Sequence, residues 1–207
     1  MSVPTDVFKA MSARSYADLR DDIRQGDLLL FSQGGFMPHL IEFATNSPFS
    51  HIGFVIRLEE IDRVMLLEAL PSGVTSAALS VVVNGNGSGA QRPYRGGLVL
   101  ARHDDFAKLV TAQKLHEISE FAFDRFGAPY AASEIVKIAL RVLAGRLNIK
   151  MPRLLQADDE YICSEYVGAC YQKVGISIPW NGLGFLAPSD FASDPKVQPI
   201  AVIANAA

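Results

Sequence analysis

The most restrictive feature of this 207-residue sequence is that its strand-like and helix-like segments are segregated along the chain. Continuous apolar runs between turn-forming residues predict strands at 28–31, 50–56, 64–70, 79–83, 98–100 and 200–203. Apolar residues at helical spacing predict helices at 16–23, 36–44, 105–126, 131–147 and 163–174. Because most strands come first and most long helices later, the pattern favours an α+β fold over alternating βαβ units. We expect one such domain over 1–207.

Composition excludes several classes of protein and partner. Hydrophobic residues make up 49% of the chain and charged residues 20%, which is enough apolar material for a folded core. The net charge of −3 argues against nucleic acid as the main partner. Residues 1–20 lack the apolar stretch of a signal peptide, and no apolar run has membrane-spanning length. A cytoplasmic location is therefore the default expectation.

Cys163 begins the last long predicted helix, directly after an acidic segment at 158–160. The first turn of a helix has unpaired N–H groups and the positive end of the helix dipole, and both favour a thiolate. The other cysteine, Cys170, lies roughly 10 Å along the same helix, beyond disulfide reach, so we expect two reduced thiols. Position alone does not separate a reactive Cys163 from an inert buried thiol. Cys170 is expected in the core.

His51 opens the predicted strand 50–56 directly after a turn. Side chains at strand ends face clefts, and an imidazole can act as a general base near neutral pH. Glu68, on the next strand, would lie beside His51 if 57–63 forms a hairpin, and could then bond the far imidazole nitrogen. The alternatives are a polar residue that merely opens a strand and a carboxylate that reaches solvent. We expect surface or structural roles for the remaining histidines, His39, His103 and His116.

Four segments carry a resemblance in their order and composition: Gly26 to Phe31, Ser50 to Val55, Gly127 to Tyr130 and Ile162 to Val167. Together they resemble the NlpC-type papain-like cysteine peptidases. The histidine segment precedes the cysteine segment, as in the circularly permuted branch to which lecithin:retinol acyltransferase-like enzymes are related. The resemblance covers about 26–174. It implies a papain-like fold of permuted topology, with an antiparallel sheet or small barrel packed against the cysteine helix.

The resemblance also implies roles for individual residues. Cys163 would be the nucleophile, His51 the base and Glu68 the residue that orients it. Tyr130 and Ser164 would bind substrate, although Tyr130 could instead be an aromatic packed at a helix start. The thiolate would attack a carbonyl to form a thioester, which water or another acceptor would cleave, with the Cys163 N–H as one oxyanion donor. This chemistry needs neither a metal nor a cofactor.

An insertion at about 131–157 separates Tyr130 from the cysteine segment and leaves the substrate open. Its predicted helix combines an apolar stripe with basic residues over 131–153. Such a helix can contact an anionic membrane, although a core-packed helix with a solvated basic face is the plainer interpretation. We expect a cysteine amidase or peptidase acting on a small peptide or peptidoglycan-like amide. The alternatives are a lipid-directed thiol acyltransferase or thioesterase, and a catalytically silent papain-like binding module.

Overall fold

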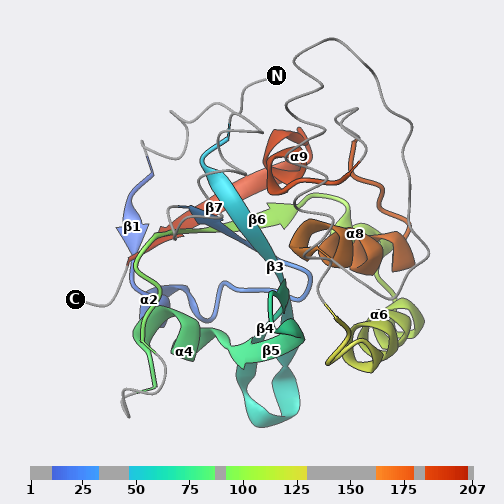
Figure 1. The fold of residues 1–207 in the computed structure, drawn as a ribbon, viewed down its shortest axis with the longest axis horizontal. Coiled ribbons are helices and arrows are strands. Elements are labelled where there is room, and N and C mark those ends of the chain that lie inside the picture. The colour runs from blue at the N-terminus through green and yellow to red at the C-terminus, as the bar shows by residue number, and fades with distance from the viewer. Residues whose placement is uncertain (1–10, 33–46, 87–91, 130–161, 180–184, 205–207) are drawn as a thin grey trace.

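A seven-stranded sheet organises the computed structural model, which describes residues 11–32, 47–86, 92–129, 162–179 and 185–204. The strand order is β1-β7-β6-β2-β3-β4-β5 (Figure 1). The strands are β1 (Ala13–Arg14), β2 (Leu28–Ser32), β3 (Phe49–Leu58), β4 (Arg63–Leu70), β5 (Gly73–Ala78), β6 (Gly97–His103) and β7 (Val197–Ile203). All neighbours pair antiparallel except β1 and β7. The sheet is open, with β1 and β5 at its edges, so the barrel alternative is not formed.

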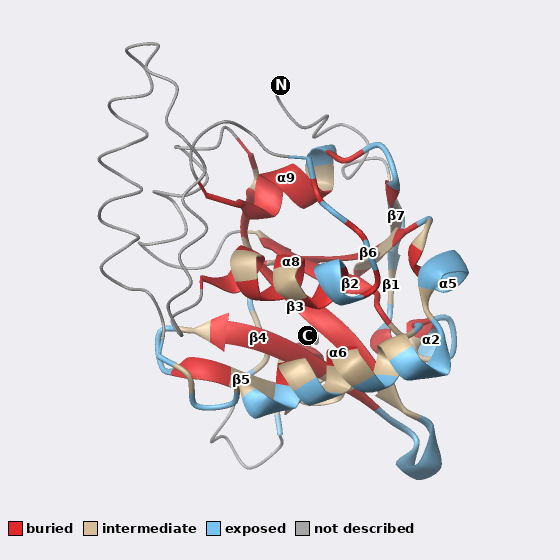
Figure 2. Ribbon diagram, turned by 90° about the vertical axis from the view of Figure 1, so that its right-hand side faces the viewer, coloured by how far each residue is buried: buried red, intermediate tan, exposed pale blue. Residues whose placement is uncertain are grey.

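Helices cover both faces of the sheet, which confirms the α+β class. Their bounds are α2 (Tyr16–Leu19), the 3-10 turn η1 (Glu59–Ile61), α4 (Leu79–Asn84), α5 (Phe106–Leu109), α6 (Ala112–Asp124), α8 (Cys163–Lys173) and α9 (Pro188–Ser193). Side chains of α6, α8 and α9 join one buried cluster, and those of α2 and α4 join another. Figure 2 shows α8 and α9 mostly buried, whereas α6 keeps an exposed outer side. None of the helices in the described ranges is both long and apolar enough to cross a membrane.

The continuous apolar run of β2 is explained by burial of both faces of the sheet. Leu28 and Leu30 belong to the cluster under α8, which we call the first core cluster. Leu29 and Phe31 belong to the cluster under α2 and α4, the second core cluster. Because successive strand residues point to opposite faces, a strand covered on both sides needs apolar residues throughout. The strands predicted at 28–31, 50–56, 64–70, 98–100 and 200–203 are confirmed, each with longer bounds.

The turn before β2 ties three elements together. Gly26 has a φ of +82°, and a Cβ there would lie 2.3 Å from the Phe106 ring, so the position requires glycine. The buried Asp27 carboxylate accepts two hydrogen bonds from Arg102 on β6, at 2.7 and 2.8 Å. Tyr171 of α8 donates its hydroxyl to the Gly26 carbonyl at 2.9 Å. This short turn therefore fixes β2 against both β6 and α8.

The single helix predicted over 105–126 is wrong. The chain forms α5 and α6 instead, with Val110 and Thr111 in extended conformation between them. The Thr111 hydroxyl accepts a hydrogen bond from the Lys114 N–H at 3.2 Å and caps α6. Two adjacent β-branched residues, one of them a good N-cap, favour this break over a continuous helix.

The strand predicted at 79–83 is also wrong, because these residues form α4. The strand that pairs with β4 here is β5, which ends directly before α4. Leu79 and Val83, four residues apart, are both buried in the second core cluster. That spacing matches one helix face, although the valine-rich composition favours a strand.

The remaining helix predictions divide into three groups. The helix at 163–174 is confirmed as α8, and the one at 16–23 is confirmed only over Tyr16–Leu19. The predicted helices at 36–44 and 131–147 lie outside the described residues, as do the 131–157 insertion and Tyr130.

Candidate active site

The candidate site lies where β3 and β4 separate. Their pairing runs from Leu58–Arg63 to Phe54–Leu67 and then stops, although β3 begins earlier, at Phe49, and β4 continues to Leu70. Beyond Leu67, β4 pairs only with β5, its neighbour on the other side. Helix α8 packs against both β3 and β4, and its first residue, Cys163, contacts His51 and Ile52 of β3. The separation leaves one edge of β3 unpaired by β4 beside the first turn of α8.

A β-bulge precedes His51 on β3. Phe31 of β2 lies across from His51, whereas the next residue, Ser32, lies across from Phe49, so Ser50 is the extra residue. Bulges bend a strand locally and re-aim the neighbouring side chain. The bulge accounts for His51 reaching the gap between the strands while its backbone stays paired with β2.

The imidazole of His51 contacts both the Glu68 carboxylate and the Cys163 sulfur. His51 Nε2 lies 2.7 Å from Glu68 Oε2, and the Glu68 side chain is 8% exposed. The same ring hydrogen bonds to the sulfur of Cys163, and this contact leaves Nδ1 as the nitrogen that faces it. The predicted β3–β4 hairpin is confirmed, and it brings Glu68 to the histidine rather than to solvent. This arrangement has the contacts that a thiol nucleophile, a base and an orienting carboxylate require.

The charges of this group favour a thiolate–imidazolium pair. Burial lowers the pKa of His51, but the neighbouring Cys163 and Glu68 outweigh it and raise that pKa to about 10. Burial likewise raises the pKa of Cys163, but the charge and hydrogen bond of His51 outweigh it, and the net shift is downward. Each partner therefore holds the other in its charged form.

Two backbone N–H groups also bond to the Cys163 sulfur, those of Ile52 and Ser164. The Val55 N–H points to the β2 side, where it donates to the backbone carbonyl of Asp27 at 2.8 Å. Because N–H groups alternate sides along an antiparallel strand, the Ile52 N–H points to the other side, where β4 has moved away. The separation of the strands thus supplies a donor to the sulfur that no sequence pattern indicates.

Ser164 and Cys170 are both buried on α8. The Ser164 hydroxyl donates to the Leu186 carbonyl at 2.5 Å, so in this structure it links α8 to the segment before α9. Substrate binding by Ser164 stays a prediction. Cys170 lies in the first core cluster, as expected, and burial raises its pKa. The pKa values of the two thiols are therefore shifted in opposite directions, down for Cys163 and up for Cys170.

The other described histidines lie away from this group. His103 is buried at the end of β6, where its Nδ1 accepts the Asp105 N–H at 3.1 Å and its Nε2 lies 3.8 Å from Asp194. Burial lowers the pKa of His103. His116 is exposed on α6. Both match the structural or surface role expected from the sequence, whereas His39 lies outside the described residues.

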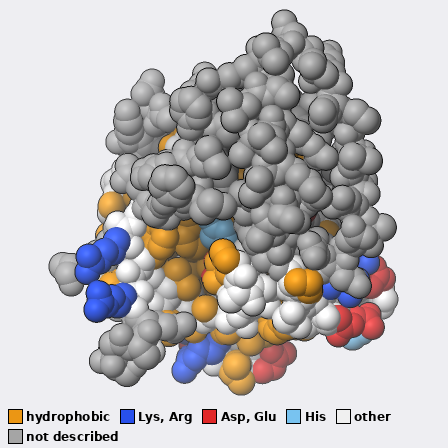
Figure 3. All heavy atoms as spheres, in the orientation of Figure 1, with side chains coloured by type: hydrophobic (Ala, Val, Ile, Leu, Met, Phe, Trp, Pro, Cys, Tyr) orange, Lys and Arg blue, Asp and Glu red, His pale blue; other side chains and the backbone are white. Residues whose placement is uncertain are grey.

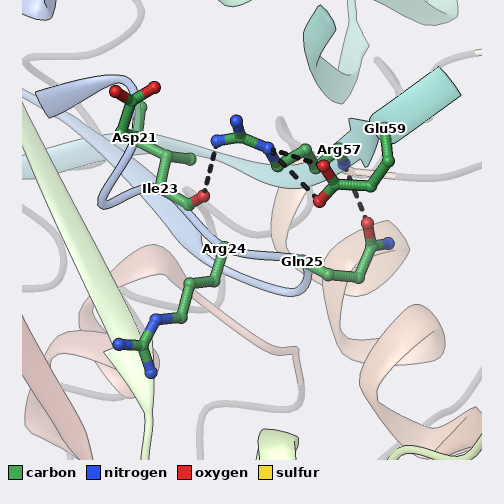
Figure 4. Close-up of a pocket in the computed structure, with 6 residues that line it drawn as sticks. All are labelled: Asp21, Ile23, Arg24, Gln25, Arg57 and Glu59. Carbon is green, nitrogen blue, oxygen red and sulfur yellow. Dashed lines mark hydrogen bonds and ion pairs between the residues drawn. The ribbon is translucent and has the colours of Figure 1, made fainter. Parts of the chain in front are cut away.

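A separate polar hollow lies at the far end of β3 (Figure 4). Its lining consists of Asp21, Ile23, Arg24, Gln25, Arg57 and Glu59. Arg57 donates its backbone N–H to Gln25 at 2.8 Å and its guanidinium to the Ile23 carbonyl at 3.2 Å. These contacts connect the segment before β2 to the end of β3, which is a structural role.

Among the described residues, charged side chains stand in separate groups at the margins of the face drawn in Figure 3. In the part of the chain that the structure describes, hydrophobic side chains gather near the middle of this face. Lysine and arginine side chains stand at its left, lower and right margins, and acidic ones at its lower and lower right margins. Within the described ranges, no group of three or more His, Cys, Asp or Glu side chains is arranged to hold a metal ion.

Replacing Glu68 with glutamine should lower the pKa of His51. Glutamine keeps the volume of the side chain but removes the negative charge beside Nε2. An opposite charge at this distance typically shifts a pKa by about 1–3 units, so we expect a fall of that order. Histidine titration by NMR measures it, with Glu60→Gln on the exposed η1 turn as the matched control. An unchanged His51 titration would show that Glu68 does not stabilise the imidazolium.

Comparison with known proteins adds information about the fold. No protein-family model matches the chain, and no curated protein matches it. The solved structure of the metalloprotein yiiX from Escherichia coli O157:H7, described as DUF1105, is similar, with a TM-score of 0.57 and 16% sequence identity. The match covers 86% of this chain and 96% of that chain. At this identity, the likeness shows a shared fold and carries no function across.

Proposed function

We propose that this chain is a thiol hydrolase that cleaves an amide bond through a thioester on Cys163. The observation that carries the proposal is the His51 ring, which bonds to Glu68 on one side and to the Cys163 sulfur on the other. We also propose that the chain has a circularly permuted papain-like fold. The α8 helix that begins at Cys163 and the preceding antiparallel β3–β4 hairpin support this assignment.

The reaction follows from the charged state of the pair. The Cys163 thiolate attacks the carbonyl carbon of the substrate and forms a tetrahedral oxyanion. The His51 imidazolium donates its proton to the leaving nitrogen, the C–N bond breaks, and a thioester remains on Cys163. Neutral His51 then takes a proton from water, which attacks the thioester and releases the acid. Glu68 holds the ring in place and stabilises its charge in the resting state.

The first turn of α8 supports a place for the oxyanion. Cys163 is the first residue of the helix, so its N–H has no acceptor within the helix. Preorganised backbone N–H groups at such a position stabilise the negative charge that develops on a carbonyl oxygen. The Ser164 N–H already bonds to the sulfur, which leaves the Cys163 N–H for the oxyanion.

Trapping of the acyl-enzyme tests the proposal. Wild-type protein is incubated with panels of short peptides, peptidoglycan-like amides, N-acyl amines and acyl lipids, and adducts on each cysteine are located by mass spectrometry. We expect an acyl adduct on Cys163 with an amide substrate, and loss of turnover in Cys163→Ala. The matched control is Cys170→Ala, which removes the buried thiol of the same helix and should retain turnover.

Other outcomes of the same panel decide between the remaining functions. Acylation only by lipid donors, followed by transfer to an amine or alcohol, would replace amide hydrolysis with lipid-directed acyl transfer. Binding without any adduct or turnover across the panel would contradict both enzymatic functions and favour a binding module.

A further inference from the structure

Phe31 lies against the His51 ring from the neighbouring strand. The two residues are directly paired between β2 and β3. Their ring centroids are 4.9 Å apart, and the ring planes meet at 61°. Phe31 is buried, at 4% exposure. Phe31 belongs to the second core cluster, so it backs the partly exposed His51 ring from the core side.

A second aromatic ring fixes Phe31 in turn. The Tyr94 ring lies 5.0 Å from the Phe31 ring at 89°, an edge-to-face arrangement. The Tyr94 hydroxyl donates to the Ser32 carbonyl at 3.1 Å, which anchors this tyrosine to the residue after Phe31. Edge-to-face pairs are directional, so each ring limits the orientations open to the next.

The His51 ring needs such a limit because its two hydrogen bonds depend on its orientation. Nε2 must face Glu68 while the opposite side of the ring faces the Cys163 sulfur. The bulge before His51 frees its side chain from regular strand geometry. Rotation of the ring would break both contacts, and Phe31 packs against the ring at a centroid distance of 4.9 Å.

We propose that Phe31 is a positioning residue that holds the His51 ring between Glu68 and Cys163. This inference rests on the proposed function and deepens it, since it names a residue on which the Cys163–His51 pair depends. The residue acts through packing and does not touch substrate.

The test compares Phe31→Leu with Phe54→Leu. Phe54 is a buried phenylalanine on β3 that contacts Phe106 and Tyr171, so its replacement removes the same atoms from the first core cluster. The readout is the pH dependence of Cys163 alkylation by iodoacetamide. We expect Phe31→Leu to move the midpoint toward that of a free thiol and to slow alkylation at pH 6.5 about 10-fold, which corresponds to one pKa unit. Phe54→Leu should keep the wild-type midpoint.

Each outcome decides the inference. A wild-type midpoint retained in Phe31→Leu, or an equal shift in both variants, would overturn it. If Phe31→Leu does not fold, Phe31→Met fills the site without a flat ring and should show the same shift; a retained midpoint there overturns the inference equally. A wild-type midpoint at the ordinary thiol value would overturn the proposed function, and the inference with it.

Discussion

Replacing His51 with alanine should slow the alkylation of Cys163 by up to about 100-fold at pH 6.5. A free thiol has a pKa of about 8.5, so only about 1% is thiolate two pH units lower. In the folded protein, the charge and hydrogen bond of His51 overcome burial and lower the pKa of Cys163. Without His51, burial acts alone and disfavours the thiolate. The measurement is the rate of iodoacetamide labelling across pH, with labelling resolved for each cysteine.

The matched control is His116→Ala, which removes an exposed imidazole from α6. This variant should label with the wild-type profile. Because Cys163 is only 3% exposed, absolute rates will be low, and the comparison rests on ratios between variants at the same pH. Parallel profiles for wild type and His51→Ala would show that the thiol is not activated by the histidine.

The pH window of the charged pair follows from the directions of the two shifts. The pKa of His51 is raised, so its contribution to stability is complete below about 6.5 and is lost as the pH rises toward about 10. The pKa of Cys163 is lowered, so its contribution is present above the ordinary thiol value and is lost as the pH falls through the folded value. The rate of wild-type labelling should therefore rise as the pH passes the folded pKa of Cys163 and stay level up to about pH 10, where His51 loses its proton.

Replacing Arg102 with methionine should reduce the free energy of unfolding by up to about 3–5 kcal/mol, the range expected when a buried charge loses its partner. Asp27 is buried, and Arg102 supplies two of its hydrogen bonds. Burial raises the pKa of Asp27, and the bonds to Arg102 oppose that rise, so the variant leaves a carboxylate that is costly to keep charged. Urea denaturation followed by circular dichroism measures the change.

Arg14→Met is the matched control for Arg102→Met. Arg14 pairs with Asp22 at 3.0 Å, and neither side chain is buried, with 39% and 57% exposed, so its loss should cost about 0–1 kcal/mol. A double variant, Asp27→Asn with Arg102→Met, should recover part of the loss because no buried charge remains. Equal losses of unfolding free energy in Arg102→Met and Arg14→Met would contradict a special role for the Asp27–Arg102 pair.

The sequence predicts the strands well where both faces of the sheet are buried. Residues such as Leu28 and Leu29 then face different core clusters, and the run stays apolar throughout. The sequence misleads at Leu79. The valine-rich composition there favours a strand, but the residues form α4, whose buried side chains Leu79 and Val83 are four residues apart. The sequence also misleads at Thr111, where a local cap outweighs the apolar periodicity on either side.

Some features of the candidate site are predicted from the sequence and others are not. His51 and Cys163 are singled out by their local segments, and Glu68 by the predicted hairpin and the family resemblance; the structure brings all three together. The Ile52 N–H and the Phe31 ring are not predicted. The first depends on β4 leaving β3, and the second on the register between β2 and β3. Both are properties of strand pairing, which no short segment encodes.

The placement of Cys163 on α8 and of its partners on β3 also makes the low pKa of the thiol depend on long-range contacts of the fold. The sulfur comes from α8, late in the chain, whereas its donors on β3 and its indirect partner on β4 come from the first half. Such a contact requires closure of a long loop, so it forms only as the fold is completed. A nascent chain, or one in which α8 has detached from the sheet, carries a cysteine of ordinary acidity. The lowered pKa of Cys163 is thus a property of the folded protein.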